Sequence, residues 1–267
     1  MDIPNLAPMI ATSRERPMPS VTRRSFLGLA VTAMAAPLAG CGRTESYRYK
    51  LTLAVNTAEG VKRASSVVEI VFWNVSVPER GIMHKLRGEA LYLDLGPGAR
   101  PLIALLTSYL HPEDRNRTYD EFIKSIRWTQ DAGPGDNILS ELYGHRSPDF
   151  MDNVARIAHM RGPHKITPTD LPDLVTFANT SDPNSVILVD PNNLQATLGP
   201  NITWHEITLE MTDEPVTKGI TTKLTWLPAY FDKNLRLDGS DLITKSNIAN
   251  RLSWWEFDQS GDLKRSR

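Results

Sequence analysis

Residues 47–73 read Tyr47-Arg-Tyr-Lys-Leu-Thr-Leu-Ala-Val55, then Asn56-Thr-Ala-Glu-Gly60, and, after five further residues, Ser66-Val-Val-Glu-Ile-Val-Phe-Trp73. The first run alternates apolar and polar side chains, which is typical of a strand with one face on the core and one face in water. The last run is rich in β-branched and aromatic residues, which favour strands. With a turn at Thr57–Gly60 between them, the two runs predict an antiparallel hairpin.

Downstream segments carry the same kind of strand pattern. Alternating leucines at 91–95, a Gly-Pro-Gly turn at 96–98 and a return at 102–106 predict a second hairpin. Two short apolar runs, 174–178 and 186–189, are joined by a turn at 181–184, and residues 203–211 alternate again. The sequence therefore predicts antiparallel strands on both sides of its middle third.

The middle third carries helix signals. A capping box at Thr118–Glu121 precedes apolar residues at helical spacing, and a shorter helix is expected at 136–143. Ser147-Pro148 is a typical helix start, and the stripe that follows it is expected to end at Gly162. A single short helix is predicted from Asp190-Pro191 to Gly199. The order of strands, helices and strands predicts a single α+β domain over residues 47–267, with antiparallel sheet flanking a central helical segment.

Composition excludes one class of partner. The 267 residues are 40% apolar and hold 30 Lys+Arg against 31 Asp+Glu. Four of the basic and two of the acidic residues precede residue 42, which leaves 26 basic and 29 acidic groups in the rest of the chain. A domain of this balance lacks the clustered positive charge of nucleic-acid-binding proteins, so no nucleic-acid partner is expected.

The N-terminal segment is typical of an export signal. Arg23 and Arg24 precede an uncharged, mostly apolar run from Phe26 to Ala39. This run is too short to span a bilayer, since a spanning helix needs roughly 20 residues. The alternative is an N-terminal helix buried in the fold. We expect a cleaved signal over residues 1–40, and if translation starts at Met18, residues 1–17 are not part of the protein.

Two resemblances specify the signal. Arg23, Arg24, Phe26 and Leu27 resemble the twin-arginine export motif, although arginine pairs also occur in general secretion signals. Leu38, Ala39, Gly40 and Cys41 resemble the bacterial lipobox, and Cys41 is the only cysteine of the chain. The lipobox resemblance implies a diacylglyceryl group on the Cys41 thiol, with fatty acids such as palmitate, and cleavage just before this residue.

The expected location follows from that anchor. Lipid on Cys41 would hold the protein at a membrane of the cell envelope, facing the periplasm, and Gly42 after the cysteine favours the outer membrane. Residues 41–46 would form a tether of under roughly 20 Å before the first strand. The domain is therefore expected close to the membrane surface.

Several residues were weighed as catalytic or metal sites. His159 and His164 lack the spacing that puts two ligands on one helical face, and His205 is expected in the core or in an interface because it alternates with Ile207 and Leu209. Residues 232–239 resemble a calcium loop but place Leu237 where glycine is required, so they are expected to form a turn. No phosphate-binding loop or nucleophile motif is present, and the sequence predicts no catalytic residue, no metal and no cofactor.

The pair Trp254-Trp255 is the strongest candidate for a partner-binding patch. It either packs one indole into the core or exposes an aromatic surface to an envelope partner. The segment from Leu188 to Thr217, with Leu227-Pro228 downstream, resembles an uncharacterised proteobacterial family and implies no activity. The leading hypothesis is a lipid-anchored binding or accessory protein, and the alternative is a periplasmic hydrolase or a cofactor- or metal-binding protein that is exported folded.

Overall fold

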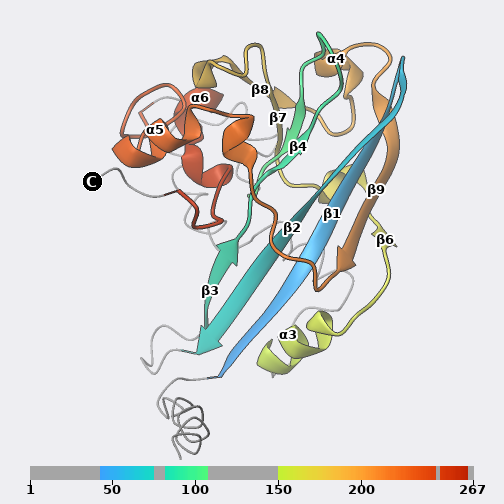
Figure 1. Cartoon of the computed structure of the whole chain (residues 1–267), viewed down its shortest axis with the longest axis vertical. Coiled ribbons are helices and arrows are strands. Elements are labelled where there is room, and N and C mark those ends of the chain that lie inside the picture. The colour runs from blue at the N-terminus through green and yellow to red at the C-terminus, as the bar shows by residue number, and fades with distance from the viewer. Residues whose placement is uncertain (1–42, 75–81, 108–149, 245–246, 264–267) are drawn as a thin grey trace, which may run out of the picture. The chain divides into compact units, whose positions relative to one another are not determined.

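The fold is described here from a computed structural model, which defines residues 43–74, 82–107, 150–244 and 247–263. The helices expected at 118–126 and 136–143 and the helix start at Ser147-Pro148 lie outside these residues, so the expected central helical segment is described only from residue 150 onward. Residues 41–267 form one compact unit. It contains two antiparallel sheets with short helices (Figure 1).

The larger sheet is built on the hairpin predicted from residues 47–73. Strand β1 (Thr44–Thr57) pairs along its whole length with β2 (Gly60–Asn74), from Thr44 opposite Trp73 to Thr57 opposite Gly60. Gly60 has a φ of 116°, a backbone conformation that favours glycine at this turn. The hairpin is confirmed, but β1 begins at Thr44, three residues before the predicted start at Tyr47.

Three more strands complete this sheet, in the order β3-β2-β1-β9-β6. Strand β9 (Thr203–Met211) matches the predicted bounds and pairs with β1, while β3 (Ile82–Arg87) pairs with β2 and the two-residue β6 (His164–Lys165) pairs with β9. Helix α3 (Phe150–Ala158) packs against β1 and ends four residues before Gly162, so the predicted end was wrong. Gly162 lies beyond the helix, in the bend that leads to β6.

The smaller sheet has the order β4-β5-β7-β8. Strands β4 (Leu91–Leu93) and β5 (Leu102–Ala104) form the predicted second hairpin, and β7 (Leu174–Phe177) pairs with β5 and with β8 (Val186–Val189). The turn between β7 and β8 contains a 3-10 helix, Pro183–Ser185, with Asp182 as its N-cap. All pairings in the two sheets are antiparallel, as the sequence predicts.

All helices after α3 are short. Helix α4 (Gln195–Leu198) ends at Gly199 as predicted but begins four residues after the predicted proline start. It is followed, beyond β9, by a 3-10 helix Ile220–Thr222, by α5 (Leu227–Lys233) and α6 (Ile248–Arg251), and by a 3-10 helix Trp254–Glu256. In Figure 1, α5 and α6 lie on the same side of the domain as β8.

Buried side chains form two hydrophobic clusters. The first joins the inner face of the larger sheet to α3 and to parts of β4, β5 and β7. The second is centred on Phe257, which packs edge-on against Trp226 at 5.5 Å between ring centroids and meets the Phe177 ring at a tilted angle at 6.0 Å. Residues of the smaller sheet that face away from the first cluster therefore pack against the C-terminal turns and form part of the second cluster.

Candidate functional site

The predicted export and lipidation residues precede the first described residue, Arg43. Arg23, Arg24, Phe26, Leu27 and the lipobox from Leu38 to Cys41 therefore lie outside the described residues. What the structure adds is the point of entry into the fold, since the chain joins β1 at Thr44.

The predicted partner patch lies in the 3-10 helix Trp254–Glu256. A capping box holds this turn, because the Glu256 carboxylate accepts hydrogen bonds from the Ser253 amide at 2.7 Å and from the Ser253 hydroxyl at 2.9 Å. The Ser253 hydroxyl in turn accepts from the Trp255 amide. Ser-x-x-Glu is a recognisable sequence signal, and it positions both indoles.

The two tryptophans have different environments. Trp254 is half-buried against the second hydrophobic cluster and meets the Phe231 ring edge-on at 4.7 Å. Trp255 meets Trp254 edge-on at 5.3 Å and is 44% exposed. Each of the two predicted alternatives therefore describes one residue of the pair: Trp254 packs on the core and Trp255 faces solvent.

Glu256 lies beneath this aromatic turn and is buried. Burial raises the pKa of its carboxyl, while the hydrogen bonds from Ser253 and the positive charge of Arg236 lower it. Its backbone carbonyl accepts from the amide of Leu106, next to β5. The turn that carries Trp254 and Trp255 is thus hydrogen-bonded to the segment that follows β5 of the smaller sheet.

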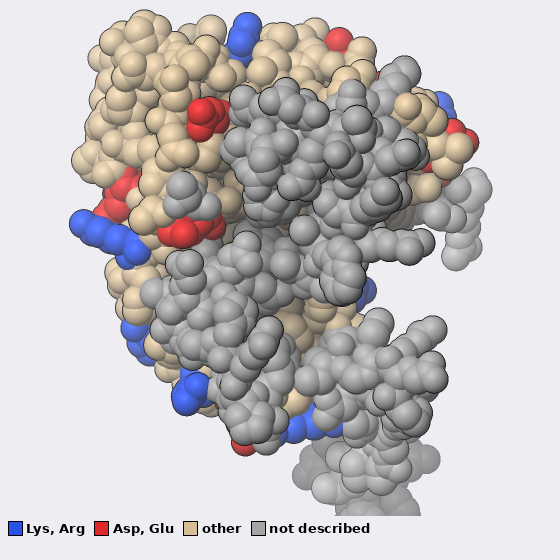
Figure 2. Space-filling model, turned by 180° about the vertical axis from the view of Figure 1, so that it is seen from behind, with Lys and Arg blue, Asp and Glu red and all other residues tan. Residues whose placement is uncertain are grey.

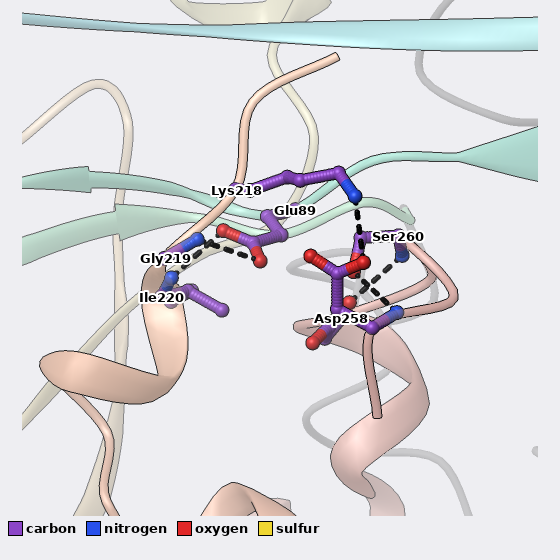
Figure 3. A network of polar contacts seen from close by, with 7 residues as sticks. Glu89, Lys218, Gly219, Ile220, Asp258 and Ser260 are labelled. Carbon is purple, nitrogen blue, oxygen red and sulfur yellow. Dashed lines mark hydrogen bonds and ion pairs between the residues drawn. The ribbon is translucent and has the colours of Figure 1, made fainter. Parts of the chain in front are cut away.

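A second polar group, which the sequence did not reveal, surrounds Glu89. Its side chain is buried and accepts hydrogen bonds from the backbone amides of Gly219 at 2.9 Å and Ile220 at 2.7 Å (Figure 3). These amides begin the 3-10 helix Ile220–Thr222, so the carboxylate caps that helix from 130 residues away. The carbonyl of Glu89 also accepts from the hydroxyl of Ser66.

The surroundings of Glu89 raise the pKa of its carboxyl above the ordinary value. Burial raises the pKa of its carboxyl, the hydrogen bonds from Ile220 and Gly219 lower it, and the negative charges of Asp258 and Asp262 raise it again. Asp258 forms a backbone bridge with Glu89 and is itself buried. One of its oxygens accepts from the Ser260 amide, and the other has no hydrogen-bond partner among the described residues.

Lys218 lies next to this group at the surface. Its ammonium is 2.6 Å from a carboxylate oxygen of Asp262 and extends past Glu89 in Figure 3. The contacts of Glu89 are structural, since they hold the C-terminal segment beside β4. A sequence signal did exist: Glu89 precedes Leu91 by two residues, so it occupies a position of the inward-facing, apolar set of the predicted strand.

Charges on the outer face of the larger sheet are paired across strands. Glu69 of β2 lies directly between Arg48 of β1 and Arg87 of β3 and forms ion pairs with both at 3.1 Å. Lys50 pairs with Glu214 at 2.6 Å. Among the coloured residues of Figure 2, Lys and Arg groups are separated from one another and interspersed with Asp and Glu.

His205 was expected in the core or in an interface. The core location is wrong, because the residue is exposed and its ring nitrogen Nδ1 lies 3.2 Å from the side-chain oxygen of Asn56, while the interface location stays a prediction. The cause is a bulge, because the register between β1 and β9 shifts at Ala54/Val55 and places Trp204 opposite Val55. Beyond this shift the alternation changes faces, so Trp204 packs on the core in place of His205.

The remaining candidates do not converge on a metal site. Of residues 232–239, the first two end helix α5 and the rest form the predicted turn, in which Asp238 accepts from Ser240 and from the Asn250 side chain. His111 and His145 lie outside the described residues. Among the residues that the structure describes, no three His, Cys, Asp or Glu side chains are grouped so that they could hold a metal ion.

Comparison with known proteins gives no relative. No protein-family model, no curated protein and no solved structure matches the chain. In the described part of the chain, no helix is both long enough and apolar enough to cross a membrane.

Proposed function

We propose that this protein is a lipid-anchored component of a bacterial cell envelope and that it binds or assists another envelope protein. The observation that carries this proposal is the sequence Leu38-Ala39-Gly40-Cys41, which places the only thiol of the chain in a lipobox behind an arginine pair and an apolar run. A thiol is the side chain of this segment that can be alkylated. The diacylglyceryl group on Cys41 attaches the protein to the membrane, on the periplasmic side and with Gly42 favouring the outer membrane.

The early start of β1 supports a close attachment. Residues 42 and 43 alone separate Cys41 from Thr44, the first residue of the sheet. One acyl chain holds a protein only marginally, whereas two or more give a durable anchor. A diacylated Cys41 therefore holds the folded domain permanently next to its membrane.

The aromatic turn supports the binding role. Trp255 is one of three large hydrophobic side chains that are well exposed in the described residues, with Val61 and Leu242. Tryptophan is enriched at the centres of protein interfaces because it buries a large area and has an N–H to donate. The capping box of Ser253 and Glu256 holds the indole in place before a partner arrives, which lowers the entropic cost of binding.

The anchor is tested by expressing the full chain and a Cys41→Ser variant in a Gram-negative host supplied with a labelled fatty acid. We expect label on the wild type alone, and an intact mass that begins at Cys41 and includes the acyl chains. An Arg23→Lys/Arg24→Lys variant reports the export route separately, since it blocks twin-arginine export. An unlabelled, uncleaved product from the wild type contradicts the proposal.

The partner is sought in the same host with a photo-crosslinking amino acid at position 255. Val61 is the matched control, because it is similarly exposed and lies next to the turn between β1 and β2. We expect a defined crosslinked species from position 255 and none from position 61. Equal crosslinking from the two positions contradicts a binding role for the aromatic turn.

A further inference from the structure

We propose that one end of the larger sheet rests on the lipid headgroups and that the hairpin β1–β2 points away from the membrane. The contact is the anchor-end patch, which we define as Thr44, Ser46, Val71, Trp73 and Lys85. This inference rests on the proposed lipid at Cys41, and it adds which surface meets the membrane and how the domain is oriented.

The length of the tether limits where the domain can lie. Three residue steps lead from Cys41 to Thr44, and each step spans at most about 3.5 Å, so the start of β1 lies within roughly 10 Å of the lipidated residue. Trp73 is the direct cross-strand partner of Thr44 and therefore shares this position. The acylated cysteine brings this end of the sheet to the headgroups before any other part of the hairpin.

The composition of the patch suits a membrane interface. Val71 lies opposite Ser46 on one side and Lys85 on the other, and all three share the outer face with Trp73, because the intervening Phe72 is buried on the inner face. Trp73 is half-buried, and its indole N–H has no hydrogen-bond partner among the described residues. Tryptophan is enriched at the level of the headgroups, where its ring is sheltered and its N–H is hydrated.

Lys85 adds charge complementarity. Its side chain is exposed and has no ion pair within the described ranges. A lysine near an anionic bilayer contributes about 1 kcal/mol of attraction and can extend its ammonium toward the phosphates. The patch therefore combines an aromatic side chain with a cation that has no ion pair to the part of the chain that the structure describes.

The arginines on the outer face of β1, β2 and β3 are already paired with carboxylates. Farther along the strands, Arg48 and Arg87 are paired with Glu69, and Arg63 is paired with Glu206 at 2.9 Å. These carboxylates cancel the attraction to an anionic membrane, and removing the pairs from water would cost free energy. The opposite face of the sheet is the protein core. An orientation in which the sheet lies flat on the membrane is therefore disfavoured, and the hairpin points away from the membrane surface.

The length of the hairpin then sets how far its turn lies from the membrane. Its first strand has 14 residues, which at about 3.3 Å per residue extend over roughly 45 Å. In the proposed orientation, Ala58, in the turn beyond β1, lies far from the membrane, and Ser46 lies near it. The two residues are both exposed, so each can carry a probe without entering the core.

The test uses the mature lipidated protein, purified from membranes and reconstituted in vesicles of phosphatidylethanolamine and phosphatidylglycerol. Ser46→Cys and Ala58→Cys variants each carry one fluorophore, because the acylated Cys41 thiol does not react. Nitroxide groups on the lipid headgroups quench fluorophores that lie near them. We expect quenching at position 46 to be several-fold stronger than at position 58.

Matched variants test the patch itself. Trp73→Ala and Lys85→Glu should each lower the quenching at position 46, whereas Val61→Ala and Lys62→Glu, near the far turn, should leave it unchanged. Circular dichroism of each variant shows that the sheet is intact. Equal quenching at positions 46 and 58, or quenching that is insensitive to Trp73 and Lys85, overturns the proposed orientation.

The same samples separate this inference from the proposed function. Intact mass shows whether Cys41 carries lipid. A protein without lipid contradicts the envelope proposal, and with it the reason to expect this contact. A lipidated protein with weak quenching at position 46 leaves the anchor established and overturns the inference alone.

Discussion

The hairpin β1–β2 and the C-terminal segment from Thr217 to Asp262 satisfy the hydrogen bonds of their backbones in different ways. In the hairpin, every residue of β1 has a partner in β2, and residues 49–56 are also paired with β9, so the backbone hydrogen bonds are formed within regular ladders. In the C-terminal segment, short turns leave amides that are bonded by buried side chains, among them Glu89, Glu256 and Asn250. A ladder distributes its stability over many equivalent bonds, whereas a buried carboxylate that serves two amides has no substitute. The C-terminal segment should therefore be the more sensitive of the two to single substitutions.

The largest effect is expected for Phe257→Ala. This ring is fully buried and contacts Trp226 and Phe177, so its removal leaves a cavity in the second cluster and should lower the free energy of unfolding by about 3–5 kcal/mol. Urea denaturation measured by circular dichroism provides the value. Trp255→Ala, two residues away and exposed, should cost under about 1 kcal/mol. Equal losses for the two variants would mean that the second cluster is not a core.

Glu89→Ala comes next and tests the comparison most directly. It leaves the buried amide of Ile220 and the solvent-accessible amide of Gly219 without their acceptor, and because a buried unsatisfied group costs about 1–3 kcal/mol, a loss of about 1–3 kcal/mol is expected. The same denaturation experiment measures it. Hydrogen exchange should also show faster exchange at residues 219–222 than in β1. A loss below about 1 kcal/mol would show that the C-terminal segment does not depend on this carboxylate.

The pH dependence of stability should carry the signature of the same residue. The pKa of the Glu89 carboxyl is raised in the folded state, so the folded protein binds a proton more tightly than the unfolded chain does. The contribution of this group is therefore fully present below its ordinary, unfolded pKa and is lost as the pH rises through the folded pKa. The free energy of unfolding of the wild type and of Glu89→Gln is measured as a function of pH. The stability of the wild type relative to Glu89→Gln should fall as the pH rises from the acidic range toward neutral. A difference that is constant with pH, or that moves in favour of the wild type, contradicts the raised pKa.

The smallest effect is expected at the hairpin turn. Glu59→Ala removes the 3.0 Å ion pair with Lys62, which is exposed to solvent and screened, so the change should stay below about 0.5 kcal/mol. Thermal unfolding monitored by circular dichroism is sufficient to compare it with the wild type. A loss as large as that of Glu89→Ala would show that the ladder is no more tolerant than the C-terminal segment.

Much of the sheet structure could be predicted because its signals are local. The strands at 186–189 and 203–211 have the predicted bounds, and the two hairpins form where alternation and turn residues indicate them. The helices α5 and α6 were not predicted, since they are short and lack a long apolar stripe. The core location predicted for His205 is wrong because the strand alternation is interrupted by a bulge, and a bulge is defined by the pairing partner as much as by the strand itself.

The residues of the candidate site likewise divide into those that short sequence patterns indicate and those that depend on packing. The lipobox, the arginine pair and the paired tryptophans are all short contiguous patterns, so they were identified from the sequence, and the export and lipid assignments stay predictions. Which tryptophan faces solvent depends on packing against Phe231, which lies more than twenty residues earlier in the chain. Trp73 became part of a proposed membrane contact only when the strand register placed it opposite Thr44.

The sequence by itself determined the two hairpins and the strands at 186–189 and 203–211, and it is the whole basis of the proposed address, because alternation, turn chemistry and signal motifs are properties of neighbouring residues. Strands β3 and β6 were not predicted. The tertiary structure alone decided that Glu89 meets amides 130 and 131 residues away, and that Asp258 is buried beside it. A buried polar group must find a partner wherever the chain can bring one, and the choice depends on how the whole domain packs. The most sensitive contacts of this protein are therefore the ones that its sequence reveals least.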